Sequence, residues 1–488
     1  MSMRLDPLLN ELEAAHLIHT SSEPEPAFLF NHVLMQENAY YSLLMKGRRE
    51  LHLLVAGAFE QEYADRLDDY VPTLAYHYWR AEDWPKAAGY AQHAGGRAMR
   101  VYALREAMNY YVQALDALDR IPNASAEEIC DVILAWSEAA FGFVPYFEQL
   151  KKLGRAEALA RQGGDKRRLA LALHTIGKLH IASGYPRRAA KSLLECFTLA
   201  TELGDEKLAV IPTFYMGMAT SDSEPRRALE WFDRAVELAR KFEDVDTEAY
   251  ALSAKAMVEG RLGEAAECQR SMEQALQLVP RIKSPMCNSD VHLYSAMAWL
   301  DLGDVRHGLE YAKLGVDKAV SADNMECACF GFACLGMGYL QAVEMPQAVQ
   351  AFEEAIRRSR ISGAESAQVL GESGLGMARF FSGEPEGVEE IENALAHARK
   401  IGEQYGIALL EQTLGQIYLE RGDLGHAISS LADALDYYRR NAIRPRMAQT
   451  LELLANALER NGEREQATAA RLERSTVETN SQYSPGQS

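Results

Sequence analysis

The sequence lacks the features that place a protein in or across a membrane. Among its 488 residues, no uncharged apolar run reaches the roughly 18 residues that a membrane-spanning helix needs. The first residues, MSMRLDPLLNELEAAH, are polar and charged and do not resemble a signal peptide. Cysteine is scarce: the seven cysteines form no Cys-x-x-Cys pair, which favours a reducing compartment. We therefore expect a cytoplasmic protein that uses cysteine as a small buried residue.

Motifs that hold phosphates, metals or nucleophiles are missing as well. The chain has no G-x-x-x-x-G-K-[ST] phosphate loop, and its one Gly-Lys pair, Gly177-Lys178, is followed by Leu179 inside a helical pattern. G-x-S-x-G, H-E-x-x-H, G-x-G-x-x-G and calcium-loop motifs are also absent. The sequence therefore predicts that the protein is not an enzyme and binds no cofactor.

Two groups of residues could in principle hold a metal ion. His16 and His19 lie three apart on an expected helix, but no third ligand accompanies them. Cys327 and Cys329 point about 200° apart on a helix, so they cannot share one site, and Cys334 does not complete one. We interpret both groups as packing residues and predict no metal site.

Positive charge is in short supply. Lysine and arginine total 51 against 70 aspartate and glutamate residues, so the formal net charge is −19. This balance argues against non-specific binding to nucleic acids or to anionic membranes.

A repeat of 39 or 40 residues runs through most of the chain. Small residues mark it at Gly177, Gly217, Ala256, Ala296, Gly336, Gly376, Gly415 and Ala455. Each interval contains two helical patterns separated by a Gly-rich turn, and the second pattern carries a small residue such as Ala189, Ala348 or Ala427 where two helices would touch. A fixed period of this length predicts stacked helical pairs that complete one another's cores.

The repeat resembles the tetratricopeptide repeat (TPR) family. Leu414-Gly415, Tyr418, Gly422, Ala427, Leu431 and Ala434 fit its consensus within one unit, and the resemblance covers roughly Val71 to Gln466. The resemblance implies an all-α, right-handed superhelix of helical hairpins. The 40-residue units are similar to the long repeats of kinesin light chains and of the maltose-regulon activator's sensor domain.

The first 70 residues show a different pattern, including Phe28-x-Phe30-x-His32 and Leu34-x-Gln36-Glu37-x-Ala39-Tyr40. This stretch resembles the winged-helix segment of STAND-type signalling ATPases, including those fused to class III nucleotide cyclases. By that resemblance His32, between Asn31 and Val33, matches a histidine that reads a bound nucleotide's phosphate. We expect a winged-helix remnant over 1–70, the first TPR-like helices over 71–125, a superhelix of about eight units over 126–474, and a disordered tail over 475–488.

Methionine follows the small marker residue in five consecutive units, at Met218, Met257, Met297, Met337 and Met377. Such a ladder could line the concave groove of the superhelix, together with Phe214, Leu293, Leu300, Leu340 and Phe380 at nearby positions. Alternatively, the methionines fill gaps between adjacent first helices. Groove lining predicts that all five are partly exposed.

These patterns together predict a non-catalytic binding scaffold and regulatory arm of a signalling system. Its partner would be a protein or peptide segment in the concave groove and, by the resemblance, an ATPase or cyclase module, with no nucleic acid and no membrane. Two alternatives remain: the detached C-terminal part of a STAND ATPase or nucleotide cyclase, and a transcriptional regulator similar to the maltose activator.

Overall fold

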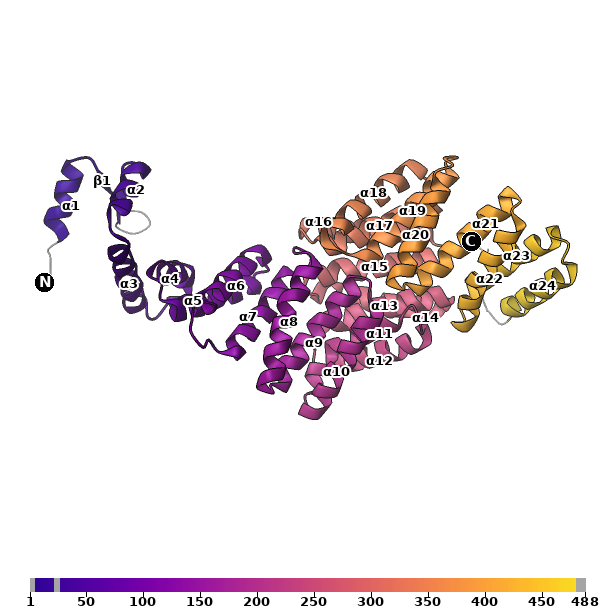
Figure 1. Cartoon of the computed structure of the whole chain (residues 1–488), viewed down its shortest axis with the longest axis horizontal. Helices are drawn as coiled ribbons and strands as arrows, with labels where there is room; N and C mark the ends of the chain where they lie inside the picture. The colour runs from indigo at the N-terminus through magenta and orange to yellow at the C-terminus, as the bar shows by residue number, and fades with distance from the viewer. Residues whose placement is uncertain (1–4, 22–26, 480–488) are drawn as a thin grey trace. The chain divides into compact units, whose positions relative to one another are not determined.

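The chain is built almost entirely from helices, as the sequence predicts (Figure 1). The computed structural model describes residues 5–21 and 27–479. It divides into two compact units, Met1–Ser125 and Ala126–Ser488. No helix in the described residues is both long and apolar enough to cross a bilayer.

The first unit contains a short β-hairpin among six helices. Its elements are α1 (Leu5–Ala14), β1 (Ile18–Ser21), β2 (Ala27–Phe30), α2 (Val33–Ser42), α3 (Met45–Glu62), α4 (Leu67–Ala81), α5 (Trp84–Arg100) and α6 (Leu104–Leu118). The two strands pair antiparallel, with Ile18 opposite Phe30. His32 caps α2, because its Nδ1 accepts a hydrogen bond from the backbone N–H of Leu34. A winged-helix identity for this segment, and nucleotide reading by His32, stay predictions.

Large apolar side chains lie on the surface of α2 and α3. Leu44 is 84% exposed, Leu54 69% and Tyr41 66%, and α2 contains no buried residue. We call Tyr41, Leu44 and Leu54 the α2–α3 surface. Water contact with this much apolar area is unfavourable, so such a surface is typical of an interaction site.

The second unit is a run of nine antiparallel helical pairs. The pairs are α7 (Ala126–Ala140) and α8 (Tyr146–Gly163), α9 (Lys166–Ala182) and α10 (Pro186–Leu203), α11 (Val210–Thr220) and α12 (Pro225–Lys241), α13 (Val245–Leu262) and α14 (Ala265–Leu278), α15 (Pro285–Asp301) and α16 (Val305–Ser321), α17 (Met325–Gln341) and α18 (Met345–Ser362), α19 (Glu365–Phe381) and α20 (Gly387–Ile401), α21 (Gln404–Arg421) and α22 (Leu424–Arg440), and α23 (Arg444–Arg460) and α24 (Arg464–Thr479). The expected disordered tail begins too early, because α24 continues through Thr479. The rest of that expected tail, 480–488, lies outside the described residues.

Local sequence explains where the helices end and begin. Gly422 ends α21 with a positive φ of 82°, a conformation that glycine adopts without steric cost. Asp423 then caps α22 by accepting a hydrogen bond from the backbone N–H of His426. Asp304 caps α16 in the same way. Gly303-Asp304 and Gly422-Asp423 are therefore turns inside helical pairs.

The small marker residues lie where the two helices of a pair touch. A Cβ built on Gly336 would lie 2.6 Å from the Phe352 ring, well inside van der Waals contact. The same holds for Gly177 against Leu193 (2.6 Å), Gly217 against Phe232 (2.5 Å), Gly376 against Ile391 (2.8 Å) and Gly415 against Leu431 (2.5 Å). Ala189, Ala348 and Ala427 on the second helices are fully buried. Small residues thus let the helices approach closely enough for one large side chain to fill each contact.

Successive turns of the superhelix touch one another within the second unit. The carbonyl oxygen of Gly142, in the turn after α7, accepts a hydrogen bond of 3.2 Å from the Met325 backbone N–H at the start of α17. Tyr185, in the turn after α9, donates one of 3.0 Å to Glu365 at the start of α19. A Cβ on Gly263, after α13, would lie 2.8 Å from Pro445 at the start of α23. Each contact joins helices that are five pairs apart, so one turn of the superhelix spans five pairs and packs against the next turn. We call this arrangement a closed superhelix.

One buried carboxyl group should make the stability of the second unit depend on pH. Glu259 in α13 is 3% exposed, and burial raises its pKa from 4.5 to about 7, although Ser271 and Lys255 act to lower it. Between these two values the folded state holds a proton that the unfolded state has released. Its contribution is therefore most favourable below pH 4.5 and is lost as the pH rises through 7.

We expect Glu259→Gln to flatten this dependence, whose slope is at most about 1.4 kcal/mol per pH unit. Urea unfolding across the pH range measures it. Glu267→Gln, at an exposed position of α14, is the control and should leave the slope unchanged. An equal slope in Glu259→Gln and the parent would contradict the prediction.

Candidate binding site on the inner face of the second unit

The first helices of consecutive pairs bring one row of aromatic rings together. The ring of Phe214 in α11 stacks on Tyr250 in α13 at 4.4 Å between centroids, and Tyr250 stacks on Tyr294 in α15 at 5.5 Å. Tyr294 meets Phe330 in α17 edge-on at 5.7 Å. We call the side of the superhelix on which these first helices converge the inner face.

Charged side chains lie beside the aromatic row. Tyr250 donates a hydrogen bond of 2.7 Å to Asp290. Burial raises the pKa of Asp290 to about 6, and burial together with the neighbouring Asp290 raises the pKa of Glu326 to about 8. Lys178 lies in the same region, with its ammonium 3.6 Å from the centre of the Phe141 ring, and burial lowers its pKa. Lys178 and Glu326 are partly exposed, although burial shifts the pKa of both side chains.

Several buried polar atoms of the inner face have no hydrogen-bond partner among the described residues. They are Tyr146 Oη, His174 Nε2, Asp301 Oδ2 and Glu403 Oε2. Tyr146 is 2% exposed, and burial lowers the pKa of His174 to about 3. Leaving such atoms unpaired costs about 1–3 kcal/mol each. The inner face therefore retains hydrogen-bonding capacity that its own side chains do not use.

A second cluster of charged residues lies near the ends of the first helices. Arg261 in α13 pairs with Asp222 at 3.0 Å, and its guanidinium lies 4.4 Å from the ring centre of Tyr405 in α21. Burial raises the pKa of Glu403, beside Asp222, to about 8, and burial also raises that of Asp301. This group joins two superhelical turns, because Tyr437 in α22 donates a hydrogen bond to the Asp222 carbonyl oxygen.

The methionine ladder is less exposed than the groove hypothesis predicts. Met257 is 4% exposed, Met297 8% and Met377 7%, whereas Met218 and Met337 are partly exposed. The expectation that all five are partly exposed is therefore wrong for three of them. The reason is close packing of adjacent first helices: the Thr413 hydroxyl of α21 lies 3.8 Å from the Met377 sulfur of α19.

The residues expected to flank the ladder divide in a similar way. Phe214, Leu293 and Leu300 are buried, at 1%, 0% and 4% exposure, and so belong to the core. Leu340 and Phe380 are partly exposed. Contact of any of these side chains with a partner stays a prediction.

Sequence reasoning missed the polar residues of the inner face, although a signal for them exists. Lys178 follows the marker Gly177 and so occupies the register of the methionine ladder one unit earlier. Asp290 occupies the register of Tyr250 and Phe330, six residues before the marker. The signal is a charged residue at a repeat position that is apolar in the other units. It becomes visible only when the units are aligned with one another.

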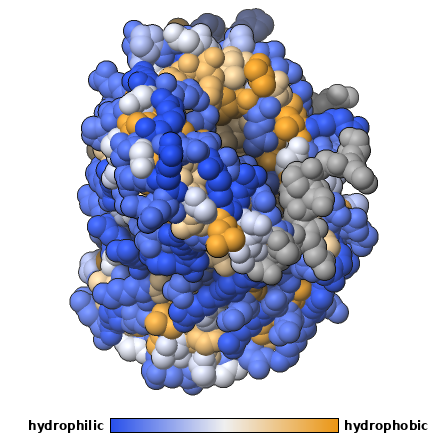
Figure 2. Space-filling view, turned by 90° about the vertical axis from the view of Figure 1, so that its right-hand side faces the viewer, coloured by the Kyte–Doolittle hydropathy of each residue, from blue (hydrophilic) through white to orange (hydrophobic). Residues whose placement is uncertain are grey.

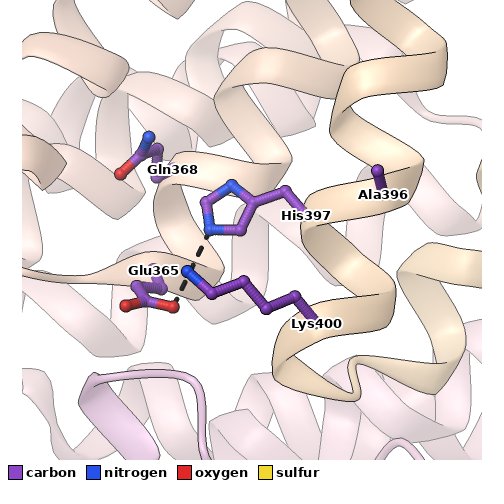
Figure 3. A pocket seen from close by; sticks show the side chains of 5 residues that line it. All are labelled: Glu365, Gln368, Ala396, His397 and Lys400. Atoms are coloured by element: carbon purple, nitrogen blue, oxygen red, sulfur yellow. Dashed lines mark ion pairs between the residues drawn. The ribbon is translucent and has the colours of Figure 1, made fainter.

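A surface pocket of about 490 Å³ lies near one contact between superhelical turns (Figure 3). His397 and Lys400 of α20 face Glu365 of α19 across it. His397 lies between two carboxylates, 2.9 Å from Glu372 and 3.8 Å from Glu365. The hydroxyl of Tyr185, from the preceding turn, also reaches Glu365. His397 and Tyr185 already pair with these carboxylates, so we interpret the pocket as part of the contact between turns.

The face of the molecule that Figure 2 shows is mainly polar. Hydrophobic residues there form several separate patches within a largely hydrophilic face. Scattered apolar residues of this kind are normal for a folded protein and indicate no particular partner.

Comparison with known proteins rests on structure alone. No protein-family profile and no curated protein matches the sequence. A Rap protein complexed with competence and sporulation factor is similar at 14% identity and a TM-score of 0.50, with 73% of this chain and 99% of that chain covered. Aspartyl phosphate phosphatase F from Bacillus subtilis gives 15% identity, coverage of 75% and 99%, and a TM-score of 0.43. The Rap conjugation gene regulator of the plasmid pLS20, in complex with the Phr* peptide, gives 12%, 74%, 98% and 0.44.

At such low identity the likeness concerns the fold. The chain is a helical repeat protein with a TPR-like superhelix, as its 40-residue period predicts. A STAND ATPase or cyclase relationship of the first 70 residues does not emerge from these comparisons and stays a prediction.

Proposed function

We propose that the second unit is a non-catalytic binding module that holds a protein or peptide segment against its inner face. The observation that carries this proposal is the set of unpaired polar atoms there, led by His174 Nε2, Asp301 Oδ2 and Glu403 Oε2. A peptide backbone supplies both donors and acceptors along its length, so it can satisfy several such atoms at once. Tyr250 and Phe330, the two partly exposed rings of the aromatic row, add apolar contact area.

Binding at this face would act on the contacts between superhelical turns. Arg261, Tyr405 and Asp222 lie near the ends of first helices and join two turns. A segment that binds them changes the spacing of the turns, which gives the module a regulatory output. Similar solved structures support the peptide as a ligand class, since two of them are complexes, one with competence and sporulation factor and one with the Phr* peptide.

In the same proposal, the first unit attaches this chain to a partner module. Its α2–α3 surface exposes Tyr41, Leu44 and Leu54, and the resemblance of residues 1–70 implies an ATPase or cyclase module as the occupant. The chain would then be the cytoplasmic sensor arm of a signalling protein.

A pull-down with four baits tests both parts. The full chain, Lys178→Met, Leu44→Asp and the control Lys191→Met are immobilised in cell extract, and bound proteins are identified by mass spectrometry. Lys178→Met keeps the apolar stem and places in this register the methionine that five later units carry. Lys191 is exposed on α10, the second helix of the same pair.

We expect the inner-face partner to be lost from Lys178→Met and retained by Lys191→Met and Leu44→Asp. A partner of the first unit should be lost only from Leu44→Asp. Partners that bind all four baits equally would count against both assignments.

A further inference from the structure

Three potential metal ligands from two adjacent first helices converge on the inner face. Asp290 comes from α15, and Glu326 and Cys327 come from the first turn of α17. One carboxylate oxygen of each acid and the Cys327 sulfur all lie within 4.8 Å of one another. Asp290 and Cys327 are buried, and Glu326 is partly exposed, which leaves a path for an ion to enter.

The negative charge of these three donors exceeds the positive charge nearby, so a cation would balance it. Asp290 and Glu326 have no ion pair within 4.0 Å among the described residues, although Lys178 lies within electrostatic range of both. Two carboxylates and a thiolate carry three negative charges, and the Lys178 ammonium carries one positive charge. A divalent cation would bring the sum to zero, and neutralisation of this kind is what buried charge requires.

An independent observation points to the same place. The Tyr146 hydroxyl, on a side chain that is 2% exposed, has no hydrogen-bond partner among the described residues. It lies within electrostatic range of Glu326, Cys327 and Asp290. The backbone supports this placement, since the Gly142 carbonyl just before α8 accepts a hydrogen bond from Met325, next to Glu326. Tyr146 is therefore an unpaired buried hydroxyl within electrostatic range of all three donors.

We propose that Asp290, Glu326 and Cys327 form a zinc site whose fourth position faces the Tyr146 hydroxyl. Two oxygen donors and one sulfur donor suit Zn²⁺, whereas Mg²⁺ and Ca²⁺ prefer oxygen alone. Ligands around tetrahedral zinc lie about 3.5 Å apart. The Cys327 sulfur is already 3.8 Å from a Glu326 oxygen, so small side-chain rotations close the site.

The neighbours of this site would orient its ligands. Tyr250 donates a hydrogen bond to Asp290 and so fixes that carboxylate, as partners of metal ligands generally do. The bound ion would join α15 to α17 and, through Tyr146, to α8 of the preceding superhelical turn. Asp290 lies almost one whole unit before Cys327 in the sequence, so the spacing of the cysteines gives no sign of this site.

Titration of the full chain, prepared without a histidine tag, tests the site. We expect one equivalent of Zn²⁺ to bind by calorimetry and to raise the melting temperature by several degrees. Co²⁺, as a spectroscopic substitute, should give a thiolate-to-metal absorption band in the near ultraviolet. Cys327→Ser should abolish that band, and Asp290→Asn should weaken Zn²⁺ binding at least about tenfold.

Cys329→Ser is the matched control. Cys329 is buried two residues further along the same helix, and its sulfur donates to the Glu326 backbone carbonyl. This variant should keep both the absorption band and the affinity. If Asp290→Asn does not fold, as judged by circular dichroism, Glu326→Gln at the partly exposed position gives the same readout. Absence of Zn²⁺ binding, or equal affinity in Cys327→Ser and the parent, would overturn the proposal.

Discussion

Replacing Gly336 with leucine is expected to lower the free energy of unfolding of the second unit by about 3 kcal/mol or more. Even the Cβ would lie 2.6 Å from the Phe352 ring. The ring has little room to move, because it is also packed closely against Gly374, where a built Cβ would lie 2.2 Å from it. Phe352 is fully buried between these two glycines of α17 and α19. Urea unfolding followed by circular dichroism measures the loss.

Two further variants separate overpacking from a general effect of replacing glycine. Gly154→Leu changes an exposed glycine of α8 that has no atom within 4 Å of a built Cβ. It should be neutral or raise stability by up to about 1 kcal/mol through helix propensity. Adding Phe352→Ala to Gly336→Leu should cost less than the sum of the two single changes, since each relieves the other. Strict additivity would show that the two side chains do not compete for space.

The distribution of the damage tests the closed superhelix. In an open array, lost protection fades with distance from α17 on both sides. Here α17 also touches the turn after α7, where Gly142 accepts the hydrogen bond from Met325. Hydrogen exchange should therefore show a second region of faster exchange around Gly142. Fading on both sides of α17 with no change at Gly142 would contradict contact between turns.

The sequence was sufficient to predict the helical pairs because the forces that form them are local. Turn residues such as Gly422 and Asp423 act within a few residues, and the contact of Gly415 with Leu431 spans a single unit. The burial of all seven cysteines also follows from local helical patterns and is confirmed. These features recur at a fixed period, so each unit reinforces the prediction for the next.

The closure of the superhelix could not be predicted in this way. Contacts such as Tyr185 with Glu365 join residues that are 180 positions apart. They depend on the small rotation between neighbouring pairs, which accumulates over five pairs and has no marker in any one unit. The same limit applies to the inner face, where Asp290 and Glu326 approach Lys178 only after the chain has wound around.

The predicted methionine groove failed in part for a related reason. The register after the marker residue points toward the inner side, but the neighbouring first helix also occupies that space. Met257 and Met297 are consequently covered, and Met218 and Met337 keep part of their surface free. Gap filling between first helices thus describes Met257 and Met297, and groove lining stays a prediction for Met218 and Met337.

Changing Met257 and Met297 together to glutamine should collapse the second unit, and the same change at Met218 and Met337 should not. Each glutamine at a buried position places an amide where its hydrogen bonds have no partner, at a cost of about 2 kcal/mol. The buried pair should therefore lose about 4 kcal/mol, a large part of the stability of a folded domain. At Met218 and Met337 water can reach the amides, so the melting temperature should stay within a few degrees of the parent.

The two double variants are matched in chemistry and in register, so they isolate burial as the cause. Circular dichroism melting compares them directly, before any partner is known. Similar melting of both variants near the parent value would mean that the superhelix opens readily and exposes the whole ladder. If only the Met257 and Met297 variant unfolds, the Met218→Gln, Met337→Gln variant can be used to measure partner binding at these positions. A loss of affinity in that folded variant cannot be attributed to unfolding.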